Sequence, residues 1–172
     1  MRRDYSMIKK TVFIVVLMFF SDLLYSQSDW KQMTWPTYGI DFMVPGNFKM
    51  IENTTDIFVA EGDGFSFAIQ PWRDSTLTVE QVAAKALEQL NADDAEITAR
   101  DKIDLNGFEG YEIIGAGQQE GEAVLFIVLG FIDPVSDLNY SAYIMFWHDP
   151  KTDDENIKIA KQIVEGVRKT NE

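Results

Sequence analysis

The sequence predicts an α+β domain in which a single antiparallel sheet of about six or seven strands carries helices on both faces, an α-β-α sandwich. Three observations support this prediction. Strand-like segments follow one another through hairpin-length connections, which is typical of antiparallel pairing. Residues 79–90 and 157–167 instead place apolar side chains at helical spacing. Several strands are apolar on both sides, so both faces of the sheet need a cover.

Length and composition exclude several classes of protein. The chain has 172 residues, 46% of them hydrophobic and 25% charged, which suits one ordinary globular domain. The absence of cysteine excludes a disulfide scaffold, a cysteine-ligated zinc site and a thiol nucleophile. The single histidine excludes a His-rich metal centre. We predict no cofactor and no metal site. The net charge of −13 argues against nucleic-acid partners and anionic lipid.

Residues 1–26 are predicted to be a signal peptide. Four basic residues precede the apolar run 11–20, and small residues at Ser26 and Ser28 follow at the spacing that signal peptidases read. Asp22 interrupts the apolar stretch, which favours a cleaved signal over a membrane anchor. We therefore expect an exported protein, periplasmic or secreted from a bacterium, with no stable membrane insertion after cleavage.

The remaining chain is predicted to be a lead-in segment, residues 27–37, and a single domain, residues 38–172. Cleavage removes four basic and two acidic side chains, so the remaining 11 basic and 26 acidic groups give a net charge of −15. Such a charge keeps an exported domain soluble and repels other acidic surfaces.

The first strands come before residue 73. Residues 38–44 alternate, with Tyr38, Ile40, Phe42 and Val44 on one face, and a turn at 45–47 ends this strand. Two further strands, 57–60 and 65–72, form a hairpin whose loop, 61–64, contains glycines that allow positive φ.

A helix over residues 79–90 follows. Its apolar stripe includes Val82 and Leu87, which we expect to face the sheet. Thr78 with Gln81 three residues later predicts a capping box at its start.

The second half of the chain contains the longest strands. Ile97, Ala99, Ile103 and Leu105 are expected on one face of a strand near an edge of the sheet, and Asn106-Gly107 then turns the chain antiparallel into 108–114. Residues 123–132 are apolar on both sides, which predicts a strand covered on both faces, and 140–147 form another strand. The last helix begins at Thr152, with Glu155 completing a second predicted capping box.

Three stretches resemble the PsbP-like family, relatives of the extrinsic PsbP subunit of photosystem II that share a fold with a Ran-binding nuclear-import factor. Residues 38–49 (YGIDFMVPGNFK) are similar to the opening strand of the family, with Phe48 where the family often has tryptophan. Residues 106–112 (NGFEGYE) are similar to a family hairpin, and 156–168 to its C-terminal helix. The resemblance implies a PsbP-like scaffold with a binding role and no shared catalytic residues.

His148 with Asp149 is the main catalytic candidate, because a histidine beside a carboxylate can act as a general base. No Gly-x-Ser-x-Gly motif supplies a nucleophile, and the sequence leaves open whether Ser136 or Ser141 lies near. A small hydrolase or lyase therefore remains an alternative, while we predict that the protein is not an enzyme.

Carboxylates around residue 150 are a candidate calcium site. Oxygen ligands at such spacing can hold Ca²⁺, which leaves a calcium-dependent envelope protein as a further alternative. The chain has no Asp-x-Asp-x-Asp-Gly loop, and acidic residues also suit the first turn of a helix. The cluster consists of Asp149, Asp153, Asp154 and Glu155.

Tryptophans are the candidate binding residues. Trp72 and Trp147 lie at the ends of predicted strands and Trp35 in the lead-in, where aromatic rings line a ligand groove or cap the core. We predict a non-catalytic binding or protein-interaction module whose partner is a protein of the cell envelope, steered by acidic loops.

Overall fold

The computed structural model describes residues 29–72, 74, 76–136 and 138–170. The predicted signal peptide, 1–26, lies outside them, and residues from Lys31 onward form one compact unit. The elements in chain order are β1 (Trp30–Trp35), β2 (Ile40–Pro45), β3 (Lys49–Asn53), β4 (Phe58–Gly62), β5 (Phe65–Trp72), α2 (Val79–Leu90), β6 (Asp93–Asp104), β7 (Glu109–Gln119), β8 (Glu122–Asp133), β9 (Leu138–Trp147), α3 (Asp153–Glu165) and β10 (Arg168–Lys169).

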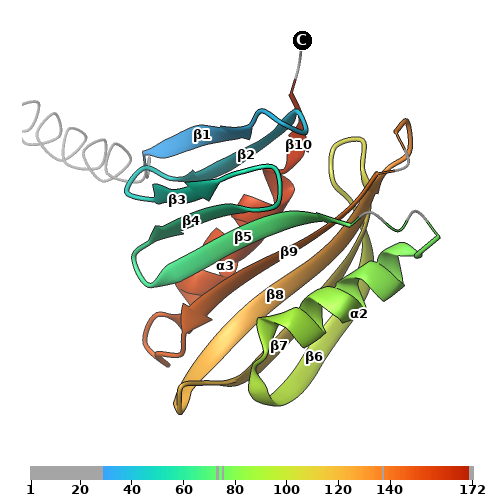
Figure 1. The fold of residues 1–172 in the computed structure, drawn as a ribbon. Coiled ribbons are helices and arrows are strands. Elements are labelled where there is room, and N and C mark those ends of the chain that lie inside the picture. The colour runs from blue at the N-terminus through green and yellow to red at the C-terminus, as the bar shows by residue number, and fades with distance from the viewer. Residues whose placement is uncertain (1–28, 73, 75, 137, 171–172) are drawn as a thin grey trace, which may run out of the picture. The chain divides into compact units, whose positions relative to one another are not determined.

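The strands form two antiparallel sheets, so the predicted single sheet with helices on both faces is wrong. The large sheet has seven strands in the order β3-β4-β5-β9-β8-β7-β6, and the small one has three in the order β1-β2-β10 (Figure 1). The error arises in the N-terminal part, because β2 pairs with β1 and with β10 at the far end of the chain rather than with a strand of the large sheet.

Helix α2 covers one face of the large sheet over β7, β8 and β9. Ala83 and Ala86 pack there against Phe126 and Val128 of β8. The approach is close at Gly130, where an added Cβ would lie 2.4 Å from backbone atoms of the helix. The predicted capping box of Thr78 and Gln81 is present.

Val82 is fully buried, whereas Leu87 is half-buried at the margin of the α2 contact. Both side chains lie on the side of the helix that packs against the sheet, as the apolar stripe predicted.

The small sheet covers the opposite face of the large sheet. Phe42 of β2 packs edge-on against Phe58 of β4, with ring centroids 4.7 Å apart, and lies 4.9 Å from Phe67 of β5. Helix α3 packs beside β2, where an added Cβ on Gly166 would meet Met43 at 3.0 Å. Strand β8 is therefore covered on both faces, as its continuous apolar run predicted.

Asp41 of β2 joins β1 to the residue that follows β10. Its carboxylate is 3% exposed and accepts hydrogen bonds from the hydroxyls of Thr34, at 2.7 Å, and Thr170, at 3.1 Å. These bonds compensate for removing the carboxylate from water and fasten the C-terminal segment to β1 and β2.

Two local predictions were wrong. Thr152 precedes α3 but makes no capping hydrogen bond with its side chain, so the second capping box is absent. Ile97 and Ala99 do not share a face of β6, because the register shifts between them and they pair with adjacent residues of β7. The edge position of β6 was predicted correctly.

Candidate functional site

Five connections of the chain meet at one end of the large sheet. The register places the β7–β8 turn, the β4–β5 turn and the end of β9 side by side, because Val124 pairs with Trp147 and Phe65 with Phe146. The β2–β3 and α2–β6 connections join them, along the left and lower margin of the sheet in Figure 1.

Acidic residues gather at the end of the large sheet where these connections meet, and we call it the acidic end. The nearby basic residues include Lys49 and Lys151, so the end carries a strong excess of negative charge. Its acidic side chains include Glu61, Asp63, Asp93, Asp94, Glu120, Glu122, Asp149 and Asp153.

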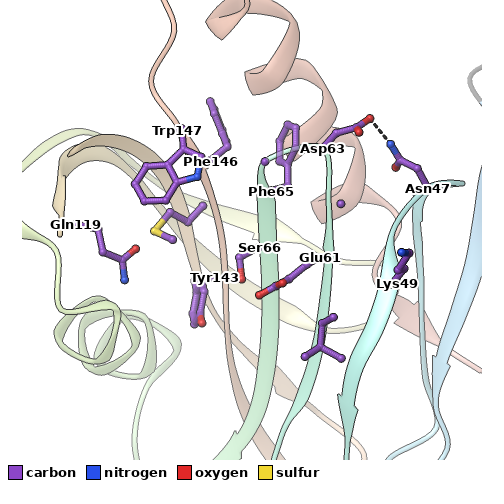
Figure 2. Close-up of a pocket in the computed structure, with 14 residues that line it drawn as sticks. Asn47, Lys49, Glu61, Asp63, Phe65, Ser66, Gln119, Tyr143, Phe146 and Trp147 are labelled. Carbon is purple, nitrogen blue, oxygen red and sulfur yellow. Dashed lines mark hydrogen bonds between the residues drawn. The ribbon is translucent and has the colours of Figure 1, made fainter. Parts of the chain in front are cut away.

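A groove of about 720 Å³ opens at the acidic end, beside α2 and on the same face of the sheet (Figure 2). Strands β3, β4, β5 and β9 form its floor, where α2 does not cover them. It is lined by Asn47, Lys49, Ile51, the 61–66 segment, Gln119, Tyr143 and the 145–147 segment.

The polar centre of the groove joins three strands. Tyr143 of β9 is hydrogen-bonded to Ser66 of β5, and Glu61 of β4 lies opposite Ser66 in the register. Burial raises the pKa of the Tyr143 hydroxyl, against the effect of the Ser66 hydrogen bond, and the charge of Glu61 raises it further. Tyr143 is therefore neutral at physiological pH.

The rim of the groove carries exposed apolar side chains. Trp147, at the end of β9, is 43% exposed, and Ile51 of β3 is 58% exposed. At the other side of the groove Asn47 donates a hydrogen bond to Asp63, which joins the β2–β3 and β4–β5 connections (Figure 2).

The structure separates the three candidate tryptophans. Trp147 lines the groove, whereas Trp35 is fully buried and donates from its indole nitrogen to the carbonyl of Thr54 at 2.7 Å. Trp72 lies half-buried beneath the Lys85 ammonium of α2, 5.5 Å from the ring centroid. Trp147 is thus the candidate that the structure brings to a surface groove.

His148 and Asp153 are brought together, with Nδ1 of the histidine 2.6 Å from the carboxylate at the first residue of α3. Neither candidate serine is near. Ser141 is buried seven residues earlier on β9, about 23 Å away at the rise of a strand, and Ser136 precedes β9 at its opposite end. The structure therefore places neither candidate serine of the hydrolase alternative beside its histidine.

Asp149 and Asp153 of the acidic cluster around residue 150 make hydrogen bonds and an ion pair with neighbouring residues. Asp153 accepts a hydrogen bond from the backbone N–H of Asp149 and pairs with His148, and Asp149 accepts one from the backbone of Lys151. Among the described residues, no group of three or more metal-ligating side chains is arranged to hold an ion.

No helix in the described part of the chain has the length and apolar character needed to cross a membrane. The groove combines a carboxylate, amide groups and exposed apolar side chains, a set that can bind a partner.

Several residues of the groove were not identified from the sequence. Ser66, Gln119 and Tyr143 looked like ordinary strand residues, because their shared location depends on the pairing of β5 with β9 and of β7 with β8. The signals that were available are the strand-end position of Trp147 and the acidic residues of the hairpin turns.

Comparisons with known proteins identify the fold. The sequence matches no protein-family model and no curated protein. The Ran-binding protein Mog1p of Saccharomyces cerevisiae is similar in structure, with a TM-score of 0.57 at 12% identity over 84% of this chain and 97% of that one. The cyanobacterial PsbP (CyanoP) of Synechocystis sp. PCC 6803 also has a TM-score of 0.57, at 7% identity over 83% and 93%.

A third similar structure is LpqN of Mycobacterium tuberculosis, a protein involved in cell envelope biogenesis. Its TM-score is 0.52 at 12% identity, covering 83% of this chain and 91% of LpqN. These neighbours share one architecture, as the sequence resemblance predicted, and the chain has the PsbP/Mog1 fold.

Proposed function

We propose that the protein is an exported, non-catalytic module that binds a protein partner in the cell envelope, and that the partner docks in the groove at the acidic end. The fold is shared with Mog1p, which binds Ran, and with LpqN, which is involved in cell envelope biogenesis. The predicted signal peptide, residues 1–26, supports the location.

The observation that carries the proposal is the exposed Trp147 beside a groove surrounded by acidic connections. Tryptophan is enriched among the residues that dominate protein interfaces, and loops held by a rigid sheet are common sites of recognition. Ile51 across the groove adds exposed apolar surface of the kind that marks interaction sites.

Site-specific photo-cross-linking in the native cell envelope tests this proposal. A photoreactive phenylalanine replaces Ile51, which lines the groove, and in a separate variant replaces Val135, which is 84% exposed in the β8–β9 connection at the opposite end of the sheet. Both sites are exposed, so neither replacement disturbs the core.

The proposal predicts one discrete protein adduct from position 51 and none of the same size from position 135. Equal labelling at both positions, or no protein adduct from position 51, would contradict it. A small apolar compound recovered in the groove, without a protein adduct, would replace the interaction module with a ligand carrier.

A further inference from the structure

We infer that the groove recognises a cationic side chain of the partner, an arginine or a lysine, held between the carboxylate of Glu61 and the indole of Trp147. This inference rests on the proposed function, because it specifies the chemistry of the partner that docks there.

The register places the two groups within reach of one side chain. Glu61 of β4, Ser66 of β5 and Met145 of β9 stand in one row across the sheet, and Trp147 follows Met145 by two residues on the same face. Neighbouring strands lie about 4.8 Å apart, so Glu61 and Met145 are separated by about 10 Å across the strands. An extended arginine or lysine lying over Ser66 can therefore contact both Glu61 and Trp147.

The carboxylate of Glu61 is available for such a contact. Within the part of the chain that the structure describes, Glu61 has no ion-pair partner, although Lys49 lies opposite it in the β3–β4 register. Figure 2 shows Glu61 directed toward Ser66 and Tyr143, on the floor of the groove. A guanidinium or ammonium group entering here gains a charge-assisted hydrogen bond.

Trp147 and Gln119 complete the recognition surface. The indole is partly exposed, and cations are attracted to the face of a tryptophan ring. The side-chain oxygen of Gln119, beside Trp147 in Figure 2, is buried without a hydrogen-bond partner among the described residues. A donor from the partner would satisfy it, since an unpaired buried acceptor is unfavourable.

Charge complementarity selects the cation over other occupants. The groove opens among the acidic connections, whose field attracts basic groups and repels anions. Lys49 is the basic side chain that lines the groove, and its charge opposes the binding of a second cation. Removing the charge of Lys49 is therefore expected to strengthen binding, whereas removing that of Glu61 weakens it.

The test uses two fluorescent, glycine-rich heptapeptides. One contains two arginines, and the other contains two citrullines at the same positions. Citrulline has nearly the shape of arginine without its charge, so the pair isolates the cation. Binding to the purified protein is followed by fluorescence anisotropy, and the Trp147 indole N–H resonance reports contact in the groove. The variants are Glu61→Gln, Lys49→Met and Asp94→Asn.

Asp94→Asn is the matched control, because it removes one negative charge from the acidic end without lining the groove. Five strand positions separate β6 from β4, about 24 Å. We expect the arginine peptide to bind at least fivefold more tightly than the citrulline peptide. Glu61→Gln should weaken it at least fivefold, Lys49→Met should strengthen it, and Asp94→Asn should change it by less than twofold.

Equal binding of the two peptides, or equal effects of Glu61→Gln and Asp94→Asn, would overturn the inference. The proposed function is tested separately by the cross-linking from position 51. If position 51 still cross-links to a protein and Glu61→Gln leaves the affinity for that protein unchanged, the docking site stands and the cation recognition is wrong.

Discussion

The side-chain amide of Asn106 donates a hydrogen bond of 3.0 Å to the carbonyl oxygen of Val167, 61 residues later in the chain. The same amide donates to the carbonyl of Glu165 at 2.8 Å. A residue that the sequence marks as a local turn signal thus also satisfies backbone acceptors where α3 ends, and it connects the β6–β7 hairpin to the C-terminal segment.

The Asn106 contact predicts the effect of Asn106→Gly. Glycine keeps the positive φ of 51° at this position but removes both hydrogen bonds, so the free energy of unfolding should fall by about 1–3 kcal/mol. Asn91→Gly is the control, because Asn91 also has φ 51°, at the C-cap of α2, where glycine is well tolerated. Equal losses in urea unfolding of the two variants would contradict a specific role for the Asn106 amide.

The close approach of α2 to β8 predicts the effect of Gly130→Ala. The added methyl group would overlap backbone atoms of Val79 and Ala83, which cannot rotate away as a side chain can. We expect a loss of about 3 kcal/mol in the free energy of unfolding. Ala84→Leu adds more volume on the exposed side of the same helix and should change the stability by no more than about 0.5 kcal/mol. A stable Gly130→Ala protein would mean that α2 packs differently.

Glu112 predicts a pH-dependent change in stability. Burial raises the pKa of its carboxyl group, opposed by the charge of Lys161, and Asp101 and Glu165 raise it further. The folded state therefore holds the proton more tightly than the unfolded state. The ionised carboxylate destabilises the fold at neutral pH, and this penalty disappears as the pH falls through the folded-state pKa to below the unfolded value.

Glu112→Gln should accordingly raise the free energy of unfolding at pH 7 and lose that advantage at pH 4, close to the unfolded value of about 4.3. Glu109→Gln, on the same strand and exposed, should change the stability by no more than about 0.5 kcal/mol at either pH. A stabilisation by Glu112→Gln that is the same at pH 7 and pH 4 would refute the assignment.

The acidic end predicts a salt dependence of partner binding. The association rate should fall several-fold between 0.01 M and 0.15 M salt, since the Debye length shortens from about 30 Å to about 8 Å. The dissociation rate should change much less, because packed apolar contacts are not screened. Stopped-flow kinetics with the partner that cross-linking identifies measures both rates. An association rate that ignores salt would exclude steering by the acidic connections.

The sequence predicted the elements with strong local patterns. The long apolar run of β8, the helical stripe of α2 and the Asn106-Gly107 turn each specify their structure through adjacent residues. Strands β1, β3 and β10 were missed, because they are short and, in β3, all five residues are exposed. The division into two sheets was missed because it depends on long-range pairing of β2 with β10.

The residues of the groove also divide into those with a local signal in the sequence and those brought together by long-range pairing. Trp147 and the acidic turns were recognisable as strand-end and hairpin features. The row of Glu61, Ser66 and Met145 joins residues that are up to 84 positions apart, and only the register of three strands brings them together. A shift of one residue in any strand would turn its side chain to the other face and remove it from the groove.

The central claim is tested most directly by the affinity of the Trp147→Ala variant for the partner that cross-linking identifies. Trp147 lines the groove and is partly exposed, so its removal should raise the dissociation constant at least about 30-fold, equivalent to about 2 kcal/mol, with little change in unfolding. Met50→Ala is the control, because Met50 is 52% exposed on β3 but does not line the groove. A dissociation constant within twofold of the unmodified protein for Trp147→Ala would contradict docking in the groove.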